Sequence, residues 1–203
     1  MARRSDHSRE ELEAMAVSAA RGIVAAEGLR GLTARRVAAE IGYSPGTLYN
    51  IFRDLDDLVV RVNAGTLDAL RDALAAVAPQ PDAEAAVLAL AAAYVRFTQE
   101  NAGLWQVLFE HRLPPGRELP PWYPQKLGRV LGLVEAACGP LLAGRAPAER
   151  AEAVRLLWTA LHGLTSLAQG GKLEFVTDRP LDAAAAAMVR IVLAGLRAAP
   201  TKV

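Results

Sequence analysis

Residues 33–52, TARRVAAEIGYSPGTLYNIF, decide the fold of this chain. They predict two short helices joined by a tight turn, the layout of a helix-turn-helix that contacts DNA. Thr33 is placed to cap the first helix, and Gly42 to end it, because glycine tolerates a positive φ. Ser44 is placed to cap the second helix, and Pro45 suits a first turn, where a missing N–H costs nothing.

The second predicted helix separates apolar from polar side chains. Leu48, Ile51 and Phe52 are spaced to face the interior. The polar side chains that are then left to face outward are those of Thr47, Tyr49 and Asn50. A buried scaffold that presents hydrogen-bonding groups is what contact with a DNA groove requires.

Composition and charge agree with a helical chain that has one basic end. The 203 residues are 52% hydrophobic and rich in alanine, and few stretches alternate as strands do, which predicts an all-α fold. The net charge is only +1, but residues 30–53 hold four arginines against Glu40. This local excess suits a DNA contact at one end, although ordinary solvated helices carry similar patches.

Several classes of protein are disfavoured by what the sequence lacks. The single cysteine, Cys138, allows neither an intrachain disulfide nor a cysteine-based zinc site. The start has no apolar segment typical of a signal peptide, and the uncharged run 85–95 is too short to span a bilayer. His7, His111 and His162 lie far apart, without a phosphate loop, a metal-spaced cluster or a nucleophile elbow. We therefore expect a cytoplasmic protein that is not an enzyme, uses no cofactor or metal and binds no membrane.

Helical periodicity and helix-breaking residues predict about nine helices in two domains. Residues 1–54 are expected to form a three-helix DNA-binding domain, and residues 55–203 a helical bundle for ligand binding and dimerisation. Residues 1–8 are predicted to be a disordered basic arm, and the proline-rich stretch 113–121 a loop. Besides the two helices within 33–52, the predicted helices cover about 9–27, 54–78, 82–100, 102–111, 123–142, 147–170 and 180–198.

This order of elements resembles the TetR/AcrR family of transcriptional regulators. The residues that carry the resemblance are Leu32-Thr33, Val37-Ala38, Gly42, Thr47-Leu48-Tyr49, Phe52 and Leu58. The segment 157–164, LWTALHGL, is similar to the Trp and His-Gly signature of one TetR subgroup with a related regulatory domain. The sequence departs from the family at Leu55, where a phosphate-binding lysine is common, and Arg53 is expected to replace that lysine in part.

The resemblance implies that the second helix of the motif lies in the major groove and that both helix starts contact phosphates. Arg35 then matches a position that reads guanine, and Asn50 reads adenine or touches a phosphate. The other expected DNA contacts are Thr33, Arg36, Ser44, Pro45, Thr47, Tyr49 and Arg53. Each of these roles has an alternative. Thr33 and Ser44 cap helices with or without DNA, and Tyr49 is half-buried. Arg35 and Arg36, in the first helix of the motif, are merely solvated.

Aromatic residues gather in the middle of the sequence, and two interpretations apply to them. The first is core packing. The second is a pocket for a mostly apolar effector, closed by the loop 113–121. The residues assigned to that pocket are Tyr94, Trp105, Phe109, His111, Trp122, Trp158 and His162. His162 can equally be a structural residue that hydrogen-bonds within the bundle.

The resemblance also implies partners. The expected protein is a homodimer, paired through its last two helices, that binds a palindromic double-stranded DNA operator as a repressor. A small-molecule effector is expected to release the DNA. In the alternatives, the last two helices only complete the monomer core, and the regulator has no small-molecule effector, being constitutive or controlled by a protein partner.

Overall fold

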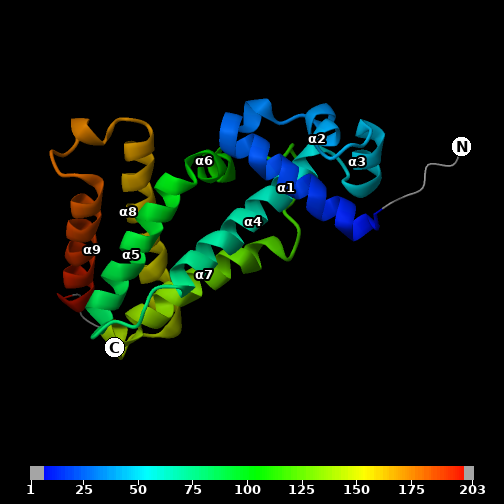
Figure 1. The fold of residues 1–203 in the computed structure, drawn as a ribbon. Helices are drawn as coiled ribbons and strands as arrows, with labels where there is room; N and C mark the ends of the chain where they lie inside the picture. The colour runs from blue at the N-terminus through cyan, green and yellow to red at the C-terminus, as the bar shows by residue number, and fades with distance from the viewer. Residues whose placement is uncertain (1–6, 199–203) are drawn as a thin grey trace, which may run out of the picture. The chain divides into compact units, whose positions relative to one another are not determined.

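The computed structural model describes residues 7–198, and over this range every regular element is helical (Figure 1). The predicted all-α fold with nine α-helices is confirmed for the described range. Three short 3-10 turns complete the list of elements. The helices are α1 (Arg9–Glu27), α2 (Ala34–Glu40), α3 (Pro45–Ile51), α4 (Leu55–Ala75), α5 (Ala83–Glu100), α6 (Ala102–Glu110), α7 (Tyr123–Cys138), α8 (Pro147–Gln169) and α9 (Leu181–Ala198).

The chain forms two compact units that do not follow a single cut along the sequence. Residues up to Leu67, together with 101–123, form the first unit, and residues 68–100 with 124 onward form the second. The segment 101–123 thus belongs with the N-terminal helices. The predicted boundary after residue 54 differs from this division, because the first unit extends to Leu67 and also includes residues 101–123. The boundary stays a prediction.

The first unit is built around α1, which packs against α2, α3 and α6. Gly103 in α6 allows this close approach, because a Cβ there would lie 3.0 Å from the carbonyl oxygen of Val24 and 3.1 Å from that of Ala25. Leu104 and Val107 of α6 thereby join the same buried cluster. The other buried members of the cluster are Leu12, Ala16, Ala20, Ile23, Val24, Leu32, Val37, Ala38, Leu48, Ile51, Phe52, Leu58, Val59 and Val62.

Capping groups explain where the helices of the first unit begin and end. Ser8 and Glu11 form a reciprocal capping box at the start of α1. Thr33 caps α2 as predicted, because its Oγ1 accepts the backbone N–H of Arg36 at 3.2 Å. Gly28 and Gly42, with φ of 68° and 76°, follow α1 and α2 in a conformation that other residues rarely adopt. Local sequence therefore sets most boundaries of the first unit.

The second unit is a bundle in which α9 packs against both α5 and α8 (Figure 1). Its buried side chains include Val87 and Phe97 of α5, Leu157 of α8 and Val189 of α9. A polar contact supplements this core near the ends of α5 and α8, where the Gln169 side-chain amide donates to the carbonyl oxygen of Thr98 at 3.0 Å. The predicted helix 54–78 ends earlier than expected, at Ala75. The predicted helix 123–142 is broken at Gly139-Pro140, so that α7 ends at Cys138 and a 3-10 turn follows.

Candidate functional site

The exposed side of α3 presents the polar groups that the sequence pattern predicts. Tyr49 is 57% exposed and Asn50 is also exposed, whereas Thr47 is half-buried. The predicted inward orientation of Leu48, Ile51 and Phe52 is confirmed by their burial, and the half-buried alternative for Tyr49 is wrong. The side chains that contact the interior are therefore distinct from those available to a partner.

Ser44 precedes α3 at the predicted N-cap position, but its side chain does not make the expected capping bond. Its backbone is extended and precedes α3, but its side chain accepts no backbone N–H. The Ser44 hydroxyl instead lies 3.2 Å from the hydroxyl of Thr47. Both Ser44 and Pro45 are exposed, so the start of α3 offers a pair of hydroxyl groups to the surface. Ser44 thus occupies the predicted N-cap position of α3, but without the side-chain hydrogen bond of a cap.

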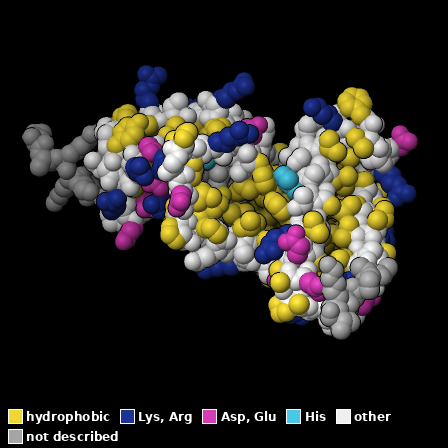
Figure 2. Space-filling model, turned by 180° about the vertical axis from the view of Figure 1, so that it is seen from behind, with side chains coloured by type: hydrophobic (Ala, Val, Ile, Leu, Met, Phe, Trp, Pro, Cys, Tyr) yellow, Lys and Arg dark blue, Asp and Glu magenta, His cyan; other side chains and the backbone are white. Residues whose placement is uncertain are grey.

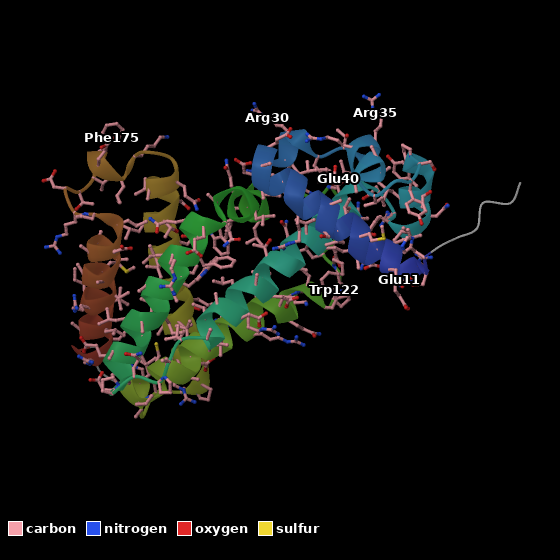
Figure 3. All side chains as sticks on the ribbon, viewed as in Figure 1. Glu11, Arg30, Arg35, Glu40, Trp122 and Phe175 are labelled. Carbon is pink, nitrogen blue, oxygen red and sulfur yellow. The ribbon has the colours of Figure 1, made fainter. Side chains whose placement is uncertain are left out.

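The two arginines of α2 differ in what surrounds them. The Arg36 guanidinium forms a two-pronged ion pair with Glu27, which raises the pKa of Arg36 and lowers that of Glu27. Arg36 also donates to the carbonyl oxygen of Gly31 at 3.3 Å. Arg35 makes no hydrogen bond or ion pair with the described residues, and Figure 3 shows it projecting away from the helix. Arg35 is thus the arginine of α2 that is open to a partner.

The start of α1 is tied to the helix-turn-helix by contacts that the sequence did not suggest. The imidazole Nδ1 of His7 lies 2.7 Å from the hydroxyl of Tyr43. Arg9 donates to the carbonyl oxygen of Ile51, the last residue of α3, at 3.1 Å. The predicted basic arm lies mostly outside the described residues, which begin at His7. These two bonds fix the point at which the chain enters the motif.

The start of α4 lies immediately after α3 and is rich in carboxylates. Asp54 Oδ1 accepts the backbone N–H of Asp57 at 2.9 Å, and Asp57 Oδ2 accepts that of Arg53 at 3.2 Å. These backbone donors are therefore occupied by the chain's own side chains. Leu55, at the position of the missing lysine, packs half-buried against the first unit's core. Among the described residues, Arg53 offers an exposed cationic side chain here.

Electrostatics at this end of the first unit are mixed rather than uniformly basic. Arg61 of α4 pairs with Glu13 at 2.6 Å and lies with its guanidinium carbon 5.7 Å from the ring centroid of Phe52. Figure 2 shows Lys and Arg side chains scattered among acidic ones over the visible face. The basic side chains on that face are thus not gathered into one large patch.

A small cavity lies in the second unit. Its volume is about 30 Å³, and its lining is aliphatic or aromatic. The lining residues are Leu74, Val87, Leu90, Ala91, Tyr94, Val130, Val134, Leu157, Trp158 and Leu161. Such a volume holds about one water molecule, far less than the roughly 300 Å³ of a typical ligand pocket. A ligand would therefore need the side chains around it to move.

The polar groups beside this cavity are held in their neutral forms. The Tyr94 hydroxyl lies 3.3 Å from Nδ1 of His162, and Trp158 stacks on the His162 ring at a centroid distance of 5.4 Å. Burial raises the pKa of Tyr94 and lowers the pKa of His162. His162 thus hydrogen-bonds within the bundle, as the structural alternative expected. The cavity wall and this pair carry no charge near pH 7.

The predicted ligand residues are divided between the two units. Tyr94 and Trp158 line the cavity, and His162 adjoins it through Tyr94. The other four predicted residues belong to the first unit and do not line this cavity: they are Trp105, Phe109, His111 and Trp122. The loop 113–121 also belongs to the first unit and does not line the cavity. Trp105 is buried with its ring 5.2 Å from that of Phe109, which suits the core-packing interpretation. The sequence alone could not separate these sets, because helical periodicity does not show which helices meet.

The helices α8 and α9 leave apolar and small residues on the surface. Leu156 is 59% exposed and Ile191 is 72% exposed. Their exposed neighbours on the two helices are Thr159, Ala160, Gly163, Ala194 and Gly195. Leu157, Leu161 and Leu193 are buried instead, so they complete the monomer core. Phe175, 82% exposed in the connection from α8 to α9, also points outward (Figure 3).

Within residues 7–198, no group of three or more His, Cys, Asp or Glu side chains is arranged to hold a metal ion. Over the same residues no single helix is long and apolar enough to cross a membrane. Only when two consecutive helical segments, Tyr123–Leu142 and Pro147–Gln169, are taken together are they long and apolar enough, and they are bent by 116° at the break between them.

Comparison with known proteins identifies both halves of the chain. Residues 16–62 match the family described as bacterial regulatory proteins, tetR family, and residues 87–192 match the tetracyclin repressor-like C-terminal domain. Comparison with curated protein sequences gives no match. The second family match covers more than half of the 203 residues.

Several solved structures share the fold at low sequence identity. A protein of unknown function from Rhodococcus sp. RHA1 is 23% identical, with a TM-score of 0.77 over 96% of this chain and 99% of its own. A TetR transcriptional regulator from the same organism is 17% identical, with a TM-score of 0.66 over 94% and 98%. RolR, solved in complex with resorcinol, is 20% identical, with a TM-score of 0.63 over 96% and 97%.

Proposed function

Because the chain belongs to the TetR family of bacterial regulatory proteins and is therefore a DNA-binding transcriptional regulator, we propose that it represses transcription as a homodimer on a palindromic operator. The observation that carries this proposal is the exposed polar side of α3, set on a buried scaffold. The family is one of transcriptional regulators and not of enzymes. Binding to DNA also makes the cytoplasm the compartment that we propose.

Contacts to DNA are assigned from exposure and from the partners of each side chain. Arg35 is the proposed base-reading residue, because its guanidinium is exposed and unengaged. Tyr49, Asn50 and Arg53 are proposed to contact the groove or the phosphates. The remaining proposed contacts, at the two helix starts and in the turn, are Thr33, Arg36, Ser44, Pro45 and Thr47. Arg36 is proposed as a weaker contact, because Glu27 already neutralises it.

Dimerisation is proposed through α8 and α9. One such motif covers too few base pairs for tight specific binding, so two recognition helices about 34–36 Å apart, or a multiple of that distance, are needed. Leu156 and Ile191 supply exposed apolar area, and the small residues beside them allow another helix to approach closely. Sedimentation velocity at micromolar concentrations tests this step, and a 21.6 kDa monomer would contradict it.

For the effector, the second unit supports an uncharged, mostly apolar compound. The cavity has an aliphatic and aromatic wall, and the neutral Tyr94–His162 pair lies beside it. Burying a charged group there without a counter-charge would be costly. RolR binds resorcinol, a small neutral aromatic compound, and a ligand of that chemical class would suit this wall. Binding would require the cavity to enlarge and would weaken DNA binding by the same factor by which DNA weakens ligand binding.

The small volume of the cavity also favours a second candidate, a regulator that has no small-molecule effector. A panel of neutral phenols and matched benzoates, titrated against the protein by calorimetry, separates the two candidates. Binding of neutral members that also lowers DNA affinity supports effector control. If no member binds, or if saturating ligand leaves DNA affinity unchanged, control by a protein partner or constitutive binding is favoured.

Arg35→Ala gives the sharpest test of the DNA contact. A duplex selected by the wild-type protein from a randomised pool serves as operator, and a scrambled duplex of equal composition serves as control. The variant should lose about 1–3 kcal/mol of discrimination between the two, because a bidentate contact to guanine is removed. Fluorescence anisotropy measures both affinities. An equal fall on both duplexes would show that Arg35 only contacts phosphate.

A further inference from the structure

We propose that Arg117 and His111 are positioning residues for DNA binding: they hold the first turn of α4, and through it they place Arg53 beside the recognition helix α3. The proposal rests on the DNA-binding function described above. All the residues concerned lie in the first compact unit. We call Arg117, His111, Asp54 and Asp56 the α4 clamp.

The contacts of the clamp join two segments far apart in the sequence. Arg117 Nη1 lies 2.5 Å from Asp54 Oδ2 and 3.8 Å from Asp56 Oδ2. His111 Nε2 lies 2.8 Å from Asp56 Oδ1. The side chains of Arg117 and His111 are only 15% and 7% exposed, whereas those of Asp54 and Asp56 are 39% and 34% exposed. The cation and the imidazole are therefore the enclosed members of the cluster, and the carboxylates face outward.

A chain of hydrogen bonds leads from the clamp to Arg53. Asp54, while paired with Arg117 through one oxygen, accepts the backbone N–H of Asp57 through the other. Asp57 in turn accepts the backbone N–H of Arg53. Arg53 follows Phe52, which is buried beneath the guanidinium of Arg61. The orientation of the exposed Arg53 side chain thus depends on carboxylates that Arg117 and His111 hold in place.

Charge gives the clamp a second effect on the same event. Three carboxylates, at positions 54, 56 and 57, lie within four residues of Arg53. Unpaired, they would repel the phosphates that Arg53 is proposed to contact. The Arg117 guanidinium offsets part of this charge, and its pairing lowers the pKa of Asp54. Arg117 thereby aids DNA binding without touching DNA.

The test separates positioning from direct phosphate contact by salt dependence together with a double-mutant cycle. Affinities for the selected duplex and the scrambled duplex are measured by fluorescence anisotropy at several salt concentrations. Arg53→Ala, which removes a phosphate contact, should reduce the slope of log K against log salt by about 0.9. Arg117→Ala should weaken binding by about five- to tenfold, the lower range of coupling between sites, and should lower that slope by no more than Arg53→Ala does. In an Arg53→Ala background the effect of Arg117→Ala should be much smaller, because Arg117 acts through Arg53. Arg117→Lys, which keeps the charge, should recover part of the loss.

Two controls keep the result interpretable. Lys126→Ala removes an ion pair of more similar exposure, with Asp68 in the second unit and outside α8 and α9, and should leave DNA affinity unchanged. In an Asp54→Asn background, which retains a capping oxygen, the effect of Arg117→Ala should shrink, because its partner charge is gone. If circular dichroism shows that Arg117→Ala is unfolded, Arg117→Gln, which keeps the aliphatic stem, takes its place.

Three outcomes would overturn the proposal: unchanged affinity, a loss of equal size with and without the Arg53 side chain, or a loss of equal size in both Asp54 backgrounds. Failure of the proposed function is a separate result. It would appear as a wild-type protein that does not distinguish the selected duplex from the scrambled one.

Discussion

The two compact units differ in where their functional polar side chains lie. The first unit places hydrogen-bonding groups of α3 on the surface and fixes their surroundings with caps and ion pairs, such as the bond from Thr33 to α2 and the pairing of Arg36 with Glu27. The second unit instead holds a partly buried polar pair, Tyr94 and His162, beside an apolar cavity. A surface that must meet a charged polymer benefits from exposed, preorganised donors, whereas a site for a neutral compound benefits from the absence of charge.

The largest expected effect tests the division of the second unit into core and surface. Leu156 and Leu157 are neighbours in α8, but they are 59% and 4% exposed. Leu157→Ala should lower the free energy of unfolding by about 2–5 kcal/mol, because it leaves a cavity in the core. Leu156→Ala should change the stability of the monomer by less than about 0.5 kcal/mol and should weaken the proposed dimer instead.

Urea unfolding followed by circular dichroism at several protein concentrations measures this difference, and sedimentation velocity reports the dimer. Equal destabilisation by the two substitutions, independent of protein concentration, would mean that both leucines belong to the monomer core.

A smaller effect tests how the first unit holds its surface groups. Thr33→Ala should cost about 1 kcal/mol of unfolding free energy, because the hydroxyl that accepts the N–H of Arg36 is lost. Ser44→Ala should cost close to nothing, since the Ser44 side chain caps no backbone donor. The two substitutions serve as matched controls in thermal and urea unfolding. A Ser44→Ala loss as large as that of Thr33→Ala would show that Ser44 caps α3 in solution.

The smallest effect concerns pH and the partly buried pair of the second unit. Burial lowers the pKa of His162, so the folded chain keeps this imidazole neutral at a pH at which the unfolded chain protonates it. The free energy of unfolding should therefore fall as the pH drops below the unfolded pKa of about 6.5, until it reaches the lower folded pKa. Thermal unfolding between pH 5 and pH 8 measures the slope, which His162→Gln should flatten. An unchanged slope in that variant would assign the pH dependence to other groups.

Local sequence information predicted much of the first unit. The period of apolar residues, the cap at Thr33 and the glycine at position 42 predicted α2 and α3 and the burial of Leu48, Ile51 and Phe52. These features arise from residues within a few positions of one another, so a sequence shows them directly. The role of Ser44 was missed, because a favourable residue type does not establish that the hydrogen bond forms.

The candidate ligand site was much harder to predict. The sequence placed seven aromatic and histidine residues in one pocket, but the structure has only Tyr94 and Trp158 lining the cavity, with His162 beside it. The other four belong to the compact unit that contains α3. Periodicity shows which side of a helix is apolar, but not which other helix will cover it.

The sequence by itself determined that the chain is helical, that it carries a helix-turn-helix at residues 33–52, and that it resembles a family of transcriptional regulators. Only the tertiary structure decided that Arg117 meets Asp54 across 63 positions of sequence, that His111 meets Asp56 across 55, and that Arg36 is neutralised while Arg35 is not. The physical reason is the range of the forces involved. Backbone conformation and capping depend on neighbouring residues, whereas ion pairs and cavities depend on side chains that packing brings together from distant parts of the chain.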